Sequence, residues 1–288
     1  PLPAHTALPS SALPSSAPAT ATVGRSRLPQ FDRAVPTPSW AVFRLPVVLQ
    51  SLILGLFLVA LVGFPAELFN KTYEEHEAEI RRRFRGLRSL GSSRLSLGPR
   101  LQLVVFFVLT AAFTALVDPS FDPGWTGVTL FVGFAAAIPV ITFAYAFPAE
   151  HYQRNASAIG GRFRVIAPVL IVAIVMTLMS RLLNFIPGYV YGLIAGYVAF
   201  KNRELSQSQQ GKSILTGVTY VLLCSLVAWI LWGTYRSVAD GPRASHAAVV
   251  LGAVIAQLVA LGIQSLVFGL MPFRFMNGYT LRQWSPLT

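Results

Sequence analysis

The sequence predicts an all-α integral membrane protein, a polytopic helical bundle with about seven transmembrane segments. Of its 288 residues, 54% are hydrophobic and only 12% are charged, and the mean hydropathy is +0.59. This composition is typical of a chain that is surrounded by lipid. Six long apolar segments are separated by polar loops. They lack the alternating pattern of barrel strands, so we expect helices, which satisfy their own backbone hydrogen bonds.

The segment 1–44 differs in composition from the rest of the chain. It is rich in Pro, Ser and Ala and carries little charge, a composition typical of semi-rigid linkers and not of a packed core. We expect an extracytoplasmic linker that joins the transmembrane domain, 45–288, to an exported portion of a longer cell-envelope polypeptide. A proline-rich tail is the alternative.

About 20 residues of helix cross the roughly 30 Å apolar core of a bilayer. Five of the apolar segments suit one span each. The remaining one, Val165–Phe200, has 36 residues and a single charge, Arg181, and is too long for one span. We interpret it as a short helical hairpin. The predicted spans are 45–66, 101–117, 127–149, 165–183, 187–200, 214–235 and 247–273.

Arg181 raises the question of how a charge is accommodated within an apolar region. At the end of the first hairpin arm, its long stem can reach the headgroups at the outer interface. A deeper position would require a partner and would make it a functional site. The polar and turn residues that we consider candidates for function are Arg181, Asn184, Pro187, Gln257, Gln264 and Asn277.

Two stripes of small residues, each with members four apart, occur in the hairpin and in the last span. Small residues on one face let two helix backbones approach closely in a membrane. We expect both stripes to serve in helix packing, with the second as a candidate partner of the first; a groove for a cofactor or substrate is the alternative. The stripes are Gly188, Gly192 and Gly196, and Gly252, Ala256 and Ala260.

The segment 72–100 has acidic residues first and basic residues after. Thr72 and Glu75 have the spacing of a capping box, which predicts the start of an amphipathic helix. No acid occurs from Arg81 to Arg100, so we expect this part to contact anionic headgroups of the inner leaflet. The expected lipid contacts are Arg81, Arg82, Arg83, Arg85 and Arg88.

The basic residues of the loops predict the orientation, because cytoplasmic loops of membrane proteins are enriched in Lys and Arg. The loops 67–100, 150–164 and 201–213 are basic, whereas 118–126 has no Lys or Arg. Counting the hairpin as two spans places all the basic loops on one side. We therefore expect a multi-pass protein of the plasma membrane with its N-terminus outside and its C-terminus in the cytoplasm. The excess of Arg over Lys suggests a bacterial source.

Several classes of function are disfavoured by the sequence. The net charge of +12 is dispersed over short loops without interleaved aromatic residues, unlike a nucleic-acid-binding surface. Four histidines lie in the tail or in expected loops, none at metal-ligand spacing. We expect no enzymatic activity, cofactor, metal or nucleic acid. The expected partners are membrane lipids with anionic headgroups, and other membrane chains or a homo-oligomer.

The stretch GLMPFRFMNGYT near the C-terminus resembles the P-x-x-x-L-D-G segment of site-2-type intramembrane metalloproteases. Pro272, Met276, Asn277 and Gly278 are in register with that pattern. In the family, an Asp of this segment binds the metal, and the present chain has Asn277 at that position. The paired histidines are also missing, so the resemblance implies an inactive relative.

Three functions follow from these patterns. The first is a non-catalytic membrane-anchoring and assembly module. The second is a transporter or channel subunit with a site at the broken hairpin 181–192, because F-x-x-G-Y recurs at 185–189 and 275–279 and transporters often contain inverted repeats. The third is the inactive protease relative.

Overall fold

The computed structural model describes residues 28–39, 43–83, 99–118, 121–157, 161–165, 174–175, 177–179, 182–183, 195–199, 205–274 and 276–285. Its elements in chain order are α1 (Gln30–Ala34), α2 (Leu45–Arg83), α4 (Pro99–Val117), α5 (Trp125–Ser157), β1 (Gly161–Val165), β2 (Ala195–Ala199), α7 (Gln207–Ala239), α8 (His246–Gly269) and α9 (Asn277–Trp284).

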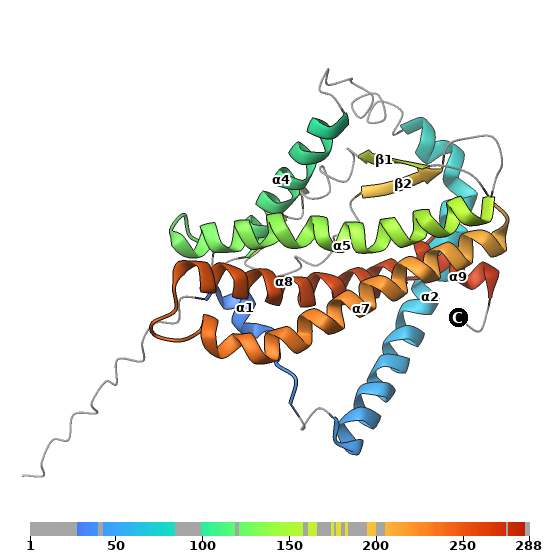
Figure 1. The fold of residues 1–288 in the computed structure, drawn as a ribbon. Coiled ribbons are helices and arrows are strands. Elements are labelled where there is room, and N and C mark those ends of the chain that lie inside the picture. Colours follow the sequence, from blue (N-terminus) through green and yellow to red (C-terminus); the bar gives the residue numbers. More distant parts are fainter. Residues whose placement is uncertain are drawn as a thin grey trace, which may run out of the picture.

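The centre of the fold is a bundle of α5, α7 and α8, which lie side by side in Figure 1. Helix α4 packs against α5, and α1 lies against α8. The core between α4 and α5 is built mainly from aromatic and aliphatic side chains such as Phe106, Leu130 and Phe134. A second core forms around Trp232 and Val249, where α7 meets α8.

Local sequence signals explain where the last two long helices begin. Ser206 and Gln209 form a capping box that starts α7, seven residues before the predicted span at 214. The side chain of Ser245 accepts a hydrogen bond from the Ala248 N–H at the start of α8. Both caps satisfy backbone donors that lack a partner in the first helical turn.

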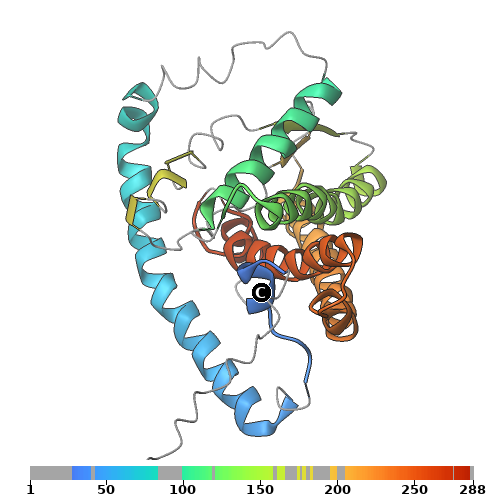
Figure 2. The same cartoon turned by 90° about the vertical axis from the view of Figure 1, so that its left-hand side faces the viewer.

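Helix α2 stands apart from the central bundle, as Figure 2 shows. It has 39 residues, which includes the predicted span at 45–66. The predicted helix start at Thr72 is wrong, because α2 continues through this position. The Thr72 hydroxyl donates to the carbonyl of Leu68, four residues earlier, which is how Thr satisfies its hydroxyl inside a helix.

Among the described residues, five helices are long and apolar enough to cross a membrane: α2, α4, α5, α7 and α8. They correspond to the five predicted single spans. Helix α5 runs unbroken through Pro139 and Pro148. The composition and these helices are those of a helical membrane protein.

The predicted second hairpin arm, 187–200, is not one continuous helix, because Ala195–Ala199 form strand β2. This strand pairs with β1 in antiparallel register, with Val165 opposite Ala195. Gly disfavours helix, and Tyr and Val favour strands, so the run Gly196-Tyr197-Val198 suits a strand. In the predicted first arm, 165–183, Val165 also lies in a strand, and 174–175, 177–179 and 182–183 are helical.

The chain between α5 and α7 begins and ends at the same end of the bundle. The Gln153 side chain near the end of α5 donates to the Ser213 hydroxyl near the start of α7, at 2.8 Å. Helices α5 and α7 are therefore antiparallel neighbours in the bundle.

Candidate functional site

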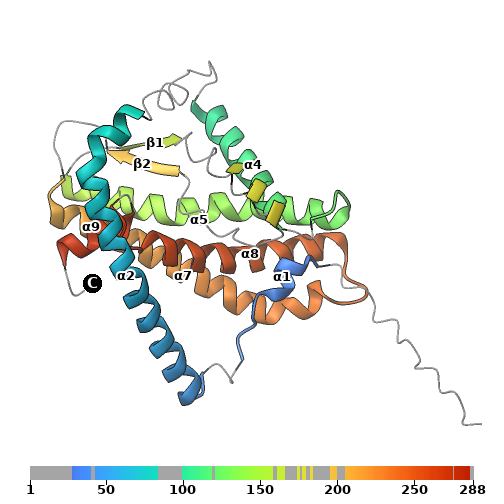
Figure 3. The ribbon, with the colours of Figure 1, turned by 180° about the vertical axis from the view of Figure 1, so that it is seen from behind.

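A buried carboxyl group lies inside the bundle where the sequence suggested a linker. Leu28, Asp32 and Val35 are all buried, so a linker does not describe 28–35 within the segment 1–44. Asp32 belongs to α1, which lies beside α8 in Figure 3. Apolar residues of α1 and its flanks direct the segment into the bundle: the Phe31 ring packs edge-on against Phe134 of α5, with ring centroids 5.5 Å apart.

Helix α7 holds the backbone that follows α1. The indole N–H of Trp232 donates to the Val35 carbonyl at 3.0 Å, and that of Trp229 donates to the Pro36 carbonyl at 2.9 Å. The Arg236 guanidinium donates to the carbonyls of Arg33 and Val35. These carbonyl groups have no hydrogen-bond partner within a helix or sheet, and the side chains of α7 supply one. The segment 33–36 is therefore attached to α7 by specific hydrogen bonds.

The Asp32 side chain meets Gln257 of α8. The amide Nε2 of Gln257 donates to Oδ1 of Asp32 at 3.1 Å, and both side chains are fully buried. Gly133 of α5 makes room for the amide, since a Cβ there would lie 2.5–2.8 Å from its oxygen, carbon and nitrogen. The amide therefore lies flat against the Gly133 backbone.

Burial raises the pKa of the Asp32 carboxyl well above its ordinary value, because a charged carboxylate is poorly solvated there. The hydrogen bond from Gln257 lowers the pKa, and the nearby Asp118 carboxylate raises it; the burial effect is the largest. The site is therefore suited to a neutral carboxyl group.

A second group of polar contacts lies beyond the C-terminal end of α8, where α2 meets the C-terminal segment. The Asn70 side chain donates to the Pro272 carbonyl and accepts from the Arg274 N–H, both at 2.8 Å. Arg274 forms ion pairs with Glu74 and Glu77 at 2.9 and 3.5 Å. We call these contacts, together with the Arg282–Glu67 ion pair, the α2 clamp.

Asn277 lies at the start of α9 and donates to the Tyr145 hydroxyl of α5 at 3.0 Å. The following Gly278 packs so closely on the Leu270 carbonyl that a side chain would overlap it. These contacts fold α9 back onto the bundle. The segment that resembles the protease pattern thus makes structural contacts here, and no group of three His, Cys, Asp or Glu among the described residues is arranged to hold a metal.

The small-residue stripe of α8 lies within the bundle. Gly252 and Ala256 are buried, and a Cβ on Gly252 would overlap the Ala239 side chain of α7. Gly252 therefore packs closely on α7. Ala260 packs against the same core, and the amide nitrogen of Gln264 is buried without a hydrogen-bond partner among the described residues.

Several predicted site residues lie outside the described part of the chain: Arg181, Asn184, Pro187, Gly188, Gly192, Arg85 and Arg88. Gly196 lies in β2 opposite Arg164. Residues 81–83 form the last turn of α2, with Arg82 exposed. The histidines expected in loops are in helices: His76 in α2, His151 in α5 and His246 at the start of α8.

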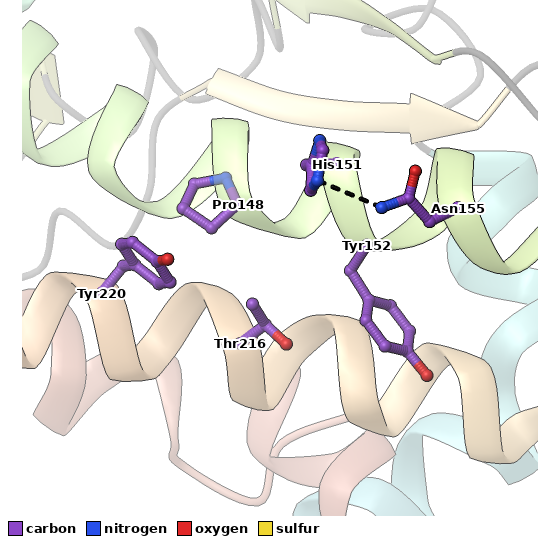
Figure 4. A pocket seen from close by; sticks show the side chains of 6 residues that line it. All are labelled: Pro148, His151, Tyr152, Asn155, Thr216 and Tyr220. Carbon is purple, nitrogen blue, oxygen red and sulfur yellow. Dashed lines mark hydrogen bonds between the residues drawn. The ribbon is translucent and has the colours of Figure 1, made fainter.

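A pocket of about 360 Å³ lies between α5 and α7 (Figure 4). Thr216 and Tyr220 line it from α7, opposite Pro148, His151, Tyr152 and Asn155 of α5. The Asn155 side chain lies 3.1 Å from the His151 Nε2. The pocket is distinct from the Asp32–Gln257 contact.

Comparison of the chain with protein-family models, with curated proteins and with solved structures finds no match.

Sequence reasoning selected Gln257 and Asn277 but missed their partners, Asp32 and Tyr145. It also missed Asn70 and Arg274. An available signal was the lone acid in the run Phe31-Asp32-Arg33-Ala34-Val35, where apolar residues surround a carboxyl group in an otherwise proline-rich segment.

Proposed function

We propose that this chain is a membrane-anchoring and assembly module, in which α2 associates with α2 of a second copy. The observation that carries the proposal is the exposure of α2: none of its most apolar 18-residue window is buried. The helix is fixed to the rest of the chain by the α2 clamp at its C-terminal half. The N-terminal half of α2 is therefore exposed on all its sides and can contact another helix within the membrane.

Small residues support association through this surface. Gly55 and Gly63 are eight residues apart, about two helical turns, and share a face of α2. Apart from the adjoining backbone of α2 itself, no atom of the described residues lies within 4 Å of a Cβ built on either glycine, so the described part of the chain does not fill their groove. In membranes, such grooves allow helix backbones to approach and gain van der Waals contacts.

Cross-linking tests this proposal. Val59, 71% exposed, lies between the two glycines. In a Cys224→Ser background reconstituted into liposomes, Val59→Cys is expected to form disulfide-linked dimers. The matched control is Val267→Cys on α8, 55% exposed. Adding Gly55→Leu and Gly63→Leu should reduce the Val59→Cys dimer; equal cross-linking at positions 59 and 267 would refute the proposal.

The proposed orientation keeps the basic loops cytoplasmic, with the N-terminus outside and the chain in the plasma membrane. The contact between the end of α5 and the start of α7 supports this orientation. A connection that starts and ends on one side of the bilayer crosses it an even number of times, so the basic loop 201–213 is expected on the same side as 84–98. In the Cys224→Ser background, Arg85→Cys and Asp122→Cys should be labelled by an impermeant maleimide from opposite sides. Labelling from the same side would contradict the orientation.

A transporter or channel subunit is the second candidate function, and the Asp32–Gln257 contact favours it. Ionisable groups inside a transmembrane bundle often mark pathways for protons or ions. Proton flux into liposomes that contain the protein, measured with an internal pH dye, tests this function. Flux that is abolished by Asp32→Asn would support it, and flux equal to that of empty liposomes would contradict it.

A further inference from the structure

Two buried oxygen atoms at the contact between Asp32 and Gln257 lack hydrogen bonds. They are Oδ2 of Asp32 and Oε1 of Gln257, and neither has a hydrogen-bond partner among the described residues. The other two polar atoms of the same groups, Oδ1 and Nε2, are bonded to each other. Unpartnered acceptors in a fully buried place are costly, and here both belong to one contact.

We propose that Asp32 is a proton-binding site in the folded protein, and that its protonated carboxyl group forms a ring of two hydrogen bonds with the Gln257 amide. In this ring, Nε2–H of Gln257 donates to Oδ1, and Oδ2–H of Asp32 donates to Oε1. One proton thereby satisfies both oxygens. Without it, a carboxylate oxygen and an amide oxygen, both acceptors, would share an apolar site.

The surroundings of Asp32 favour the neutral form. Asp118 at the end of α4 opposes a second negative charge. The Arg236 guanidinium of α7 is directed to the carbonyls of Arg33 and Val35. Residues 125–149 of α5 and 247–269 of α8 contain no charged side chain. On α1 itself, Arg33 is exposed.

The proton couples the docking of α1 to pH. Gln257 is the twelfth of the 24 residues of α8, so the contact lies at the middle of that helix. Loss of the proton places a negative charge against Oε1 of Gln257 and weakens the attachment of α1. This inference does not depend on either proposed function.

Infrared spectroscopy of the purified protein tests the proposal directly. A protonated carboxyl group has a carbonyl stretching band that a carboxylate lacks. At pH 7, the wild type should show this band, and Asp32→Asn should lose it. Asp118→Asn is the matched control and should retain it. Gln257→Leu removes the acceptor of the Asp32 proton and should shift the band to higher frequency.

Three outcomes would overturn the proposal. The first is a wild-type spectrum without the band at pH 7. The second is a band that persists in Asp32→Asn. The third is a band that appears only when sodium and potassium are replaced by choline, which would identify a metal-cation site between the two oxygens instead.

The pH dependence of unfolding provides an independent measurement. Below about pH 4, the folded and unfolded chains both carry the proton. As the pH rises from there, the unfolded chain releases it and the folded chain keeps it, up to the raised pKa of the folded state. In this window, the unfolding constant of the wild type should increase about tenfold per pH unit relative to that of Asp32→Asn. Parallel pH profiles of the two proteins would contradict the proposal.

Discussion

Helices α2 and α8 are both apolar enough to cross a membrane, but they have opposite environments. The most apolar 18-residue window of α8 is half buried, whereas that of α2 is not buried at all, although the α2 window has the higher mean hydropathy. Hydropathy therefore identifies both spans and does not distinguish their positions in the fold.

The difference lies in the kind of side chain at each contact. Helix α8 carries Gly252, Ala253 and Ala256, which permit close packing, and Gln257, which binds Asp32. Helix α2 has large aliphatic side chains around its N-terminal half and polar contacts only in its C-terminal half. The N-terminal half of α2 also carries small residues, Gly55 and Gly63, so the feature that sets α8 apart from it is a polar side chain paired inside the bundle.

The largest effect is expected for Trp232→Ala. Trp232 is fully buried between α7 and α8 and donates to the Val35 carbonyl, so the change creates a cavity and removes a hydrogen bond. We expect a loss of about 3–5 kcal/mol in the free energy of unfolding. Phe57→Ala on α2, where Phe57 is 60% exposed, is the control. Reactivity of the half-buried Cys224 thiol during detergent-based denaturation reports unfolding. Similar losses of stability in both variants would show that Phe57 of α2 is packed as tightly as Trp232 of α7.

Gly252→Leu should have the next largest effect. A side chain at this position overlaps Ala239, so α7 and α8 must separate, at a cost of about 1–3 kcal/mol. Gly55→Leu on α2 meets open space, and its unfolding should change by less than about 0.5 kcal/mol. The melting temperatures of the two variants in one detergent provide the measurement. A larger decrease for Gly55→Leu would show that α2 is packed within the chain.

The sequence could predict the five apolar helices because hydropathy is a local property. The segments 101–117 and 127–149 lie within α4 and α5, and 214–235 lies within α7. The stripe at Gly252 and the polar residue Gln257 could also be selected, since residues four and seven apart share a helix face.

The contacts between distant segments could not be predicted in this way. Asp32 and Gln257 are 225 residues apart, and Asn70 and Pro272 are 202 apart. A single sequence contains no periodic signal that links such pairs. The strand at Ala195–Ala199 depends on pairing with Gly161–Val165, which is also a tertiary constraint. The prediction of a helix from hydropathy is therefore wrong at 195–199.

Asn70→Ala tests whether α2 is held by its polar half. The Asn70 side chain is buried and makes two hydrogen bonds to the backbone of the C-terminal segment, so its removal leaves the Pro272 carbonyl and the Arg274 N–H unpaired. We expect a loss of about 1–3 kcal/mol. Thr72→Ala, which removes only a bond to the carbonyl of Leu68 in the same helix, is the control. Chemical denaturation in detergent would measure both, and a neutral Asn70→Ala would show that the clamp does not hold α2.

The smallest effect is expected for Arg282→Ala. Its comparison with Arg274→Ala tests which ion pair of the α2 clamp stabilises the fold. The side chains of Arg282 and Glu67 are 55% and 59% exposed, so solvent screens their ion pair. Its removal should cost less than about 0.5 kcal/mol.

Arg274 is 34% exposed, contacts two glutamates and lies over the Tyr73 ring at 5.9 Å from its centroid, close to the outer limit of a cation–π contact. We therefore expect Arg274→Ala to cost about 1 kcal/mol, with part of that loss removed by high salt. Melting temperatures at low and high salt measure the total loss of stability and the part of it that depends on salt. Equal losses for the two arginines would show that net charge at this end, and not the geometry around Arg274, attaches α2 to the bundle.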